Sequence, residues 1–166
     1  MHVVPAPPWR PSGSPAVRLR GEVHEVRAVA VDVSPQIATA WVQEIANIAL
    51  TEVKADVVEV HPDGDGAGTY EVRGRFAGVP WQGVFRYVLR PDGFHSVQAV
   101  RQRMHPQVSG GFTVVGTGDS GCVVVHYEQY LLRGLARVLR LPFAWYIRRS
   151  MRRELDDLAH LLPAPP

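Results

Sequence analysis

The spacing of apolar residues changes three times along the chain, from two residues to about 3.6, back to two and again to about 3.6, and these changes predict its secondary structure. Residues 22–33 are rich in valines that alternate with small or polar residues, which predicts a first strand. Ser34 and Pro35 then provide a helix N-cap and a first helical residue. Apolar residues follow at spacings of three and four, which predicts a helix of about fifteen residues.

Six further segments have the composition of strands, and short turn-forming clusters separate them. The predicted strands are residues 52–60, 69–76, 81–90, 94–105, 111–116 and 122–131. The separators are rich in Gly, Asp and Pro, and each is short enough to close an antiparallel hairpin. From about Pro142 to Leu162 the apolar spacing is helical again, which predicts a long amphipathic C-terminal helix.

These elements predict an α+β fold in one domain. A strongly curved seven-stranded antiparallel sheet, wrapped around the long C-terminal helix and with helices between strands 1 and 2, would bury the apolar faces of both. The chain of 166 residues fits a single domain, which we place at residues 21–162. Residues 1–20 are rich in Pro, Ser and Gly and are predicted to form a disordered leader, with residues 163–166 as a similar tail.

The order of elements resembles that of the START-like (SRPBCC) superfamily, which includes polyketide cyclases, lipid-transfer proteins and other ligand-binding proteins. The resemblance rests on the Val33-Ser34-Pro35 entry into a helix that contains Trp41, on the Gly-Cys-Val-Val-Val start of the last strand, and on the closing helix. It covers about residues 22–162. The resemblance implies a helix-grip fold with an internal apolar cavity, and a protein that binds or transfers a hydrophobic small molecule such as a lipid, isoprenoid or polyketide-like compound.

Aromatic residues alternate with polar residues along two of the predicted strands and are expected to face the inside of the sheet. With apolar residues of the two main helices, they form the candidate ligand-binding set: Trp41, Tyr70, Phe76, Trp81, Phe85, Tyr87, Ile147, Met151 and Leu155. Aromatic walls suit planar or isoprenoid ligands. The alternative is that these side chains simply fill a core.

The last strand carries the candidate catalytic residues His126, Glu128 and Tyr130, which alternate with a second set that includes Tyr127. If the first set faces the cavity, the three side chains can polarise a carbonyl or move a proton in an aldol-type cyclisation or dehydration. The protein would then be an enzyme resembling polyketide cyclases and aromatases. In the alternative, His126 and Glu128 face solvent and Tyr127 points inward.

Other kinds of chemistry lack their sequence signatures. The net charge of +2 does not indicate a nucleic-acid partner, and no phosphate loop or dinucleotide fingerprint is present, so no cofactor is expected. Cys122 is the single cysteine, and no metal site is expected because Cys and His do not occur at ligand spacing. The chain shows no signal-peptide core or apolar stretch long enough to span a membrane, which predicts a cytoplasmic location.

Positive charge gathers near the C-terminus, where seven arginines lie between Arg133 and Arg153. Within this region Arg133, Arg137 and Arg140 have helical spacing in an apolar segment. We expect this to be a solvated helix face, its charge partly offset by Glu154, Asp156 and Asp157. The alternative is an amphipathic flap at the edge of the cavity that contacts an acidic acyl carrier protein or an anionic membrane surface.

Overall fold

One antiparallel sheet of seven strands forms the body of the protein in a computed structural model that describes residues 22–100, 106–118 and 121–162. The strands are β1 (Glu22–Val31), β2 (Val57–Gly64), β3 (Ala67–Phe76), β4 (Val79–Arg90), β5 (Gly93–Gln98), β6 (Gln107–Gly116) and β7 (Cys122–Leu131). Their order in the sheet is β1-β7-β6-β5-β4-β3-β2. Strands β2 to β7 therefore form a continuous meander, and β1 closes the row by pairing with β7.

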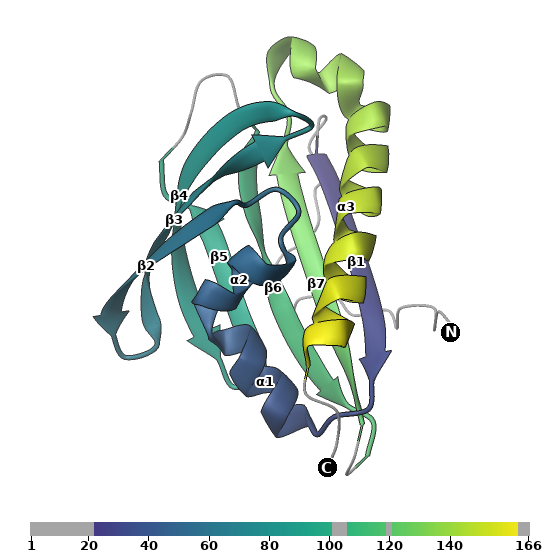
Figure 1. Cartoon of the computed structure of the whole chain (residues 1–166). Helices are drawn as coiled ribbons and strands as arrows, with labels where there is room; N and C mark the ends of the chain where they lie inside the picture. The colour runs from purple at the N-terminus through teal and green to yellow at the C-terminus, as the bar shows by residue number, and fades with distance from the viewer. Residues whose placement is uncertain (1–21, 101–105, 119–120, 163–166) are drawn as a thin grey trace.

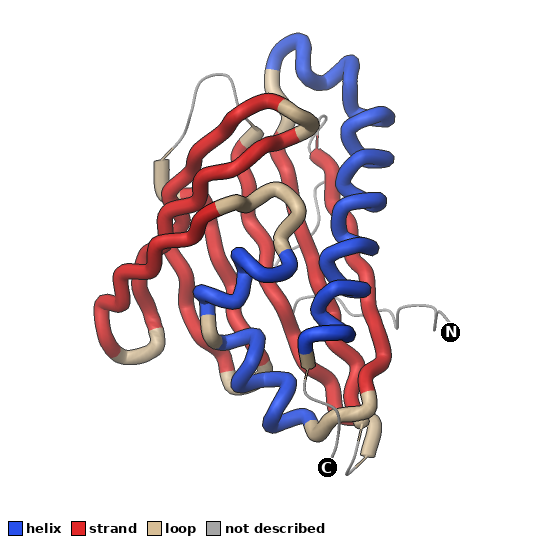
Figure 2. The backbone as a smooth tube through the Cα atoms, viewed as in Figure 1, coloured by secondary structure: helices blue, strands red, loops and turns tan. Residues whose placement is uncertain are grey.

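The helices lie on the inner face of this curved sheet (Figures 1 and 2). They are α1 (Pro35–Gln43), the short 3₁₀ helix η1 (Ile45–Asn47), α2 (Ile48–Thr51), a second 3₁₀ helix η2 (Gly134–Leu139) and the long α3 (Arg140–Leu161). Helix α3 runs along β1, and α2 packs against α3. The predicted α+β helix-grip architecture is confirmed, including the helices between the first two strands.

Helix α3 packs against the sheet through the apolar stripe that its sequence predicts. Ile147, Met151 and Leu158 are fully buried on its inner face. Complete burial of such side chains contributes about 1.5–3 kcal/mol each to the hydrophobic driving force. The stripe divides between two core clusters, one with Leu155 and Leu158 and the other with Ile147 and Met151.

Several predicted boundaries differ from the structure. The strand predicted at 52–60 begins only at Val57, because a turn precedes it and the Lys54 carbonyl accepts a hydrogen bond from Trp81 Nε1 at 2.8 Å instead of pairing in a ladder. The strand predicted at 111–116 begins earlier, at Gln107. The strand predicted at 94–105 ends at Gln98. The helix predicted as one piece is interrupted at Glu44, whose extended backbone caps α1 before η1 begins.

Some expectations fall on residues outside the described part of the chain. These are the disordered leader at 1–20, the tail at 163–166 and the residues 101–105 of the fifth predicted strand. Within the described residues, none of the helices combines the length and the apolar character that crossing a membrane requires.

Candidate functional site

A partly open pocket of about 100 Å³ lies between the inner face of the sheet and the segment that joins α2 to β2. Six aromatic side chains from β3, β4, β5 and β6 form most of its wall: Tyr70, Phe76, Trp81, Phe85, Phe94 and Phe112. Tyr70 and Phe85 stack with ring centroids 5.1 Å apart, and Trp81 meets Phe85 edge to face. The Tyr70 hydroxyl donates to Ser96 Oγ at 2.9 Å, so its polar end is satisfied and its ring is held in place.

The candidate ligand-binding residues divide into two groups in the structure. Tyr70, Phe76, Trp81 and Phe85 line the pocket. Trp41, Tyr87, Ile147, Met151 and Leu155 are instead packed in the two core clusters and are not part of the pocket lining. Sequence alternation identifies the inner face of a strand, but it does not distinguish wall from core on that face.

The three polar candidates on β7 all face inward. His126, Glu128 and Tyr130 are buried and line the pocket, and the alternative orientation of β7 is therefore wrong. The imidazole ring of His126 stacks on Phe112 with centroids 4.2 Å apart. The Tyr130 hydroxyl donates to Glu128 Oε2 at 3.0 Å, which fixes the orientation of both side chains.

A buried lysine joins this polar wall to helix α3. Lys54 Nζ lies 2.7 Å from a Glu52 oxygen, 2.8 Å from Glu154 Oε1 and 3.1 Å from Glu128 Oε1. It also donates to Ser150 Oγ at 3.1 Å, and Ser150 in turn donates to Glu154 Oε1 at 2.5 Å. One ammonium group is thus shared by three carboxyl groups from three different parts of the chain.

Burial and neighbouring charges shift the pKa values of Glu52 and Glu154 in opposite directions. Burial, followed by repulsion from Glu154, raises the pKa of Glu52 well above its ordinary value, although Lys54 opposes the shift. Burial by itself would also raise the pKa of Glu154. The attraction of Lys54, followed by that of His126, outweighs this effect and lowers the pKa of that carboxyl group. The two pKa values are therefore shifted in opposite directions, and Glu52 keeps its proton to a higher pH than Glu154 does. The same carboxylates raise the pKa of Lys54 despite its burial, which keeps it charged.

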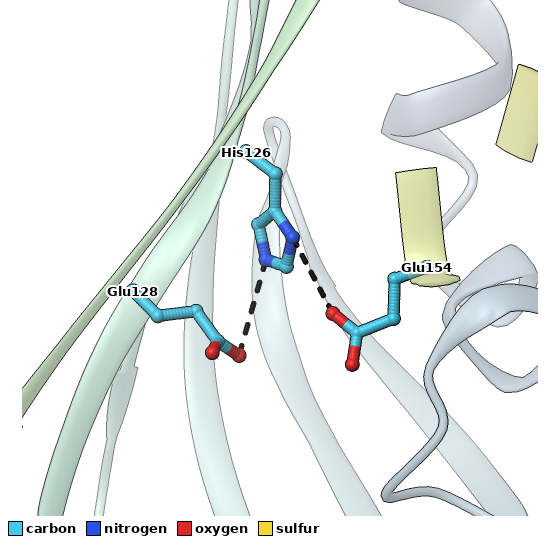
Figure 3. Close-up of side chains that lie close together, drawn as sticks. All are labelled: His126, Glu128 and Glu154. Atoms are coloured by element: carbon cyan, nitrogen blue, oxygen red, sulfur yellow. Dashed lines mark ion pairs between the residues drawn. The ribbon is translucent and has the colours of Figure 1, made fainter. Parts of the chain in front are cut away.

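His126 on β7 lies between two carboxyl groups, that of Glu128 on the same strand and that of Glu154 on helix α3 (Figure 3). Its Nδ1 lies 3.5 Å from Glu154 Oε2, and both of these buried atoms lack a hydrogen-bond partner among the described residues. Its Nε2 lies 3.9 Å from Glu128 Oε1. Burial lowers the pKa of His126 although the neighbouring carboxylates oppose this, so the imidazole is neutral at pH 7. The pocket lining therefore includes a neutral base, His126, and a carboxyl group of raised pKa, Glu52, and groups of these two kinds can accept and donate protons.

Three side chains of this cluster have the ligand types of a metal site. His126, Glu128 and Glu154 each offer one ligand atom, and these atoms lie within 4.8 Å of one another. Lys54 Nζ, however, already bonds both carboxylates, so its charge takes the place that a cation would take between them. The arrangement therefore fits an ion-pair network better than a metal centre.

Sequence reasoning missed half of this cluster. Glu52 and Lys54 were assigned to a strand, and Glu154 was expected on a solvated helix face, whereas it is 1% exposed. That expectation is wrong because Glu154 lies seven residues after Ile147 and four before Leu158, within the inward stripe of α3. The sequence signal for this burial is a polar residue inside an apolar stripe. Ser150 is a second polar residue in the same stripe.

Acidification is expected to destabilise the protein through His126. Its pKa in the folded state lies below the value of about 6.5 in the unfolded chain, so the unfolded state binds more protons and stability is lost as the pH falls through 6.5. The free energy of unfolding from urea titrations should decrease by up to about 1.4 kcal/mol per pH unit as the pH falls below about 6.5. His126→Gln should lack this part of the decrease, while His24→Gln, at an exposed position, should retain it. Equal slopes in all three proteins would contradict the assignment.

This chain is similar to known proteins in its structure but not in its sequence. No protein-family model and no curated protein matches the chain. Among solved structures, the Zhui aromatase/cyclase from Streptomyces sp. R1128 is similar with a TM-score of 0.67 and 13% identity, over 84% of this chain and 90% of that one. A START superfamily protein from Mycobacterium smegmatis has a TM-score of 0.64 and 12% identity over 84% and 96% of the two chains.

A third similar structure is a truncated norcoclaurine synthase from Thalictrum flavum, with a TM-score of 0.63 and 13% identity over 90% of this chain and 100% of that chain. At these identities the likeness establishes the fold, which is the START-like helix-grip fold that the sequence resembles. It does not transfer an activity, because one fold serves many functions.

Proposed function

We propose that this protein binds a hydrophobic small molecule that carries a carbonyl or hydroxyl group, with its apolar part against the aromatic wall of the pocket. The observation that supports this most directly is that one pocket combines an aromatic wall with buried polar side chains, among them His126, Glu128 and Tyr130 on β7, which we call the polar wall. Ligand pockets typically combine a large apolar surface with a few polar groups that fix orientation. The two walls would select a flat apolar molecule and orient its oxygen.

The size of the pocket limits what enters it. A volume of about 100 Å³ is smaller than the roughly 300–1,000 Å³ of pockets that enclose drug-sized ligands. An engineered apolar cavity of about 150 Å³ accommodates benzene. We therefore infer that the pocket takes a ring-sized part of the ligand, and that a longer lipid, isoprenoid or polyketide-like molecule extends through the open side.

A cyclase or aromatase-like activity is the second candidate, favoured by the acid and base on the polar wall. Neutral His126 can remove a proton from the carbon beside a carbonyl, while Glu52, whose raised pKa favours its protonated form, donates a proton to a carbonyl oxygen. The resulting enol can then attack a second carbonyl of the same molecule, with loss of water. Tyr130 and Glu128 would position His126 and the substrate oxygen, and the chemistry requires no cofactor. Positioning of the two reacting groups would supply much of the rate enhancement.

Native mass spectrometry of the protein purified from its host tests the proposal. The expected result is a mass increase under gentle conditions that disappears on denaturation, with a released molecule that contains an apolar ring or chain and an oxygen function. Absence of a bound species, together with no binding of phenol or acetophenone in calorimetric titrations, would contradict a ligand-binding pocket. Incubation with an aryl diketone that can close a ring separates the two candidates: recovery of the unchanged compound indicates a binding protein, and loss of one water indicates the cyclase.

A further inference from the structure

The end of the molecule where α3 begins exposes several large apolar side chains. Val138 and Leu141 are each 80% exposed, and Leu139 and Trp145 are each 61% exposed. Figure 1 shows η2 and the first turns of α3 beyond the end of β7 and beside the β3–β4 hairpin. We call these four residues the apolar tip. Exposed apolar patches of this kind mark interaction sites more often than ordinary surface.

Arginines are frequent in the segment that carries the apolar tip. Residues 133–153 contain seven arginines and neither Asp nor Glu, and one of the seven, Arg148, pairs with Glu25 of β1 at 2.8 Å. Arg137 and Arg140 are exposed and lie directly beside the tip residues in the chain. The Arg149 guanidinium lies 5.8 Å from the centroid of the Trp145 ring, so a cation and an amphipathic aromatic group share one exposed face of α3. This end of the protein is therefore both apolar and strongly positive.

We propose that the apolar tip and its arginines dock the protein on the surface of an anionic lipid bilayer. The interface of a bilayer accepts apolar side chains at the boundary of the acyl region, while the phosphates above them bind arginine. Tryptophan is enriched at this depth because its ring is apolar and its N–H is polar. The tip presents these groups in the required combination: aliphatic side chains, one tryptophan and flanking guanidinium groups.

Two other occupants fit the surface less well. A symmetric pair of this chain would bring each set of arginines against its own copy, and like charges across an interface are unfavourable. An acidic carrier protein would neutralise the arginines, but a surface rich in carboxylates gives Val138, Leu141 and Trp145 no apolar partner. An anionic bilayer satisfies both the charge and the apolar side chains.

The docking surface is connected to the pocket by direct contacts. Phe76 lines the pocket, and its ring lies 5.5 Å from that of Phe143 and 5.0 Å from that of Tyr146, both in the first turns of α3. The backbone N–H of Ala77 donates to the Tyr146 hydroxyl at 3.0 Å, which ties the β3–β4 hairpin to the same turns. An apolar ligand would therefore have a short route between bilayer and pocket. This last step rests on the proposed function, whereas docking itself does not.

Vesicle flotation with the full chain tests the docking. We expect the protein to float with vesicles of phosphatidylcholine that contain about one-third phosphatidylglycerol, and to stay in solution with phosphatidylcholine alone. The Arg137→Glu/Arg140→Glu variant should bind the anionic vesicles at least roughly 30-fold more weakly, since the loss of each basic residue near the surface costs about fivefold and the new carboxylates add repulsion. Leu141→Ser/Trp145→Ser should also reduce binding while it leaves all charges in place.

A matched control separates local docking from general charge. Arg86→Glu/Arg90→Glu makes the same change in net charge at two exposed positions in the half of β4 that is farther from the β3–β4 hairpin. It should keep most of the vesicle binding, and circular dichroism melts should confirm that all variants fold. Equal loss in the control, or no binding of the wild type to anionic vesicles, would overturn the proposal. Binding to an acidic carrier protein with no vesicle binding would overturn it in favour of a protein partner. Neither outcome would bear on whether the pocket binds a ligand.

Discussion

Replacement of Lys54 by methionine is expected to reduce the free energy of unfolding by about 3–5 kcal/mol, because removal of one partner from a buried ion pair leaves the other charge uncompensated. Here three carboxyl groups lose the ammonium that they share. Methionine keeps most of the length of the side chain, so lost packing contributes little. Urea unfolding at neutral pH measures the change, and the melting temperature should fall by about 10 °C.

Two comparisons show whether charge is the cause. Addition of Glu154→Gln to Lys54→Met should restore part of the stability, because it removes one of the unpaired carboxylates. Arg73→Ala, which breaks an exposed pair with Glu59, should cost no more than about 1 kcal/mol. If Lys54→Met destabilises no more than Arg73→Ala does, the buried cluster is not held together in the way described.

Enlargement of a residue on the pocket wall is expected to block ligand binding with little loss of stability. Val108 is half-buried on β6 and lines the pocket, so the added atoms of Val108→Phe would enter the space that the ligand needs. Forcing a side chain into occupied space costs about 1–3 kcal/mol, which corresponds to a loss of affinity of about 5- to 150-fold. Calorimetric titration with phenol and acetophenone, and recovery of any co-purified ligand, measure the effect.

The control for this variant is the same substitution on the opposite face of the sheet. Val97→Phe lies on β5 at a position that is 38% exposed, and it should leave both affinity and stability close to those of the wild type. Loss of binding in both variants would show that the effect does not arise at the pocket. Unchanged binding in Val108→Phe would show that the ligand lies elsewhere.

The architecture could be predicted from the sequence because each element carries its own period. Alternation along β3 and β4 placed Tyr70 and Phe85 on the inner face, and turn residues such as Pro91 and Gly93 marked a hairpin. The stripe of α3 placed Ile147 and Met151 against the sheet. These signals can each be read from a short segment of the chain. Few sheet architectures bury all of these apolar faces at once, so the fold could be predicted.

The site was only half predictable, because its members come together through contacts between distant segments. Lys54 meets Glu128 and Glu154, which are 74 and 100 residues away in the chain. No local period encodes such a meeting, and burial of a lysine runs against its usual exposure. The reliable hint was on α3, where Glu154 interrupts an apolar stripe and therefore needs a buried cation.

The buried position of Lys54 has a consequence for chemical labelling. It is the only lysine of the chain, and its amine is both enclosed and held protonated by three carboxyl groups. A reagent that acylates free amines has no exposed lysine side chain to modify while the fold is closed. Acylation of Lys54 therefore requires a local opening that exposes its amine. The rate of this acylation measures how often the interior of the protein is exposed to solvent.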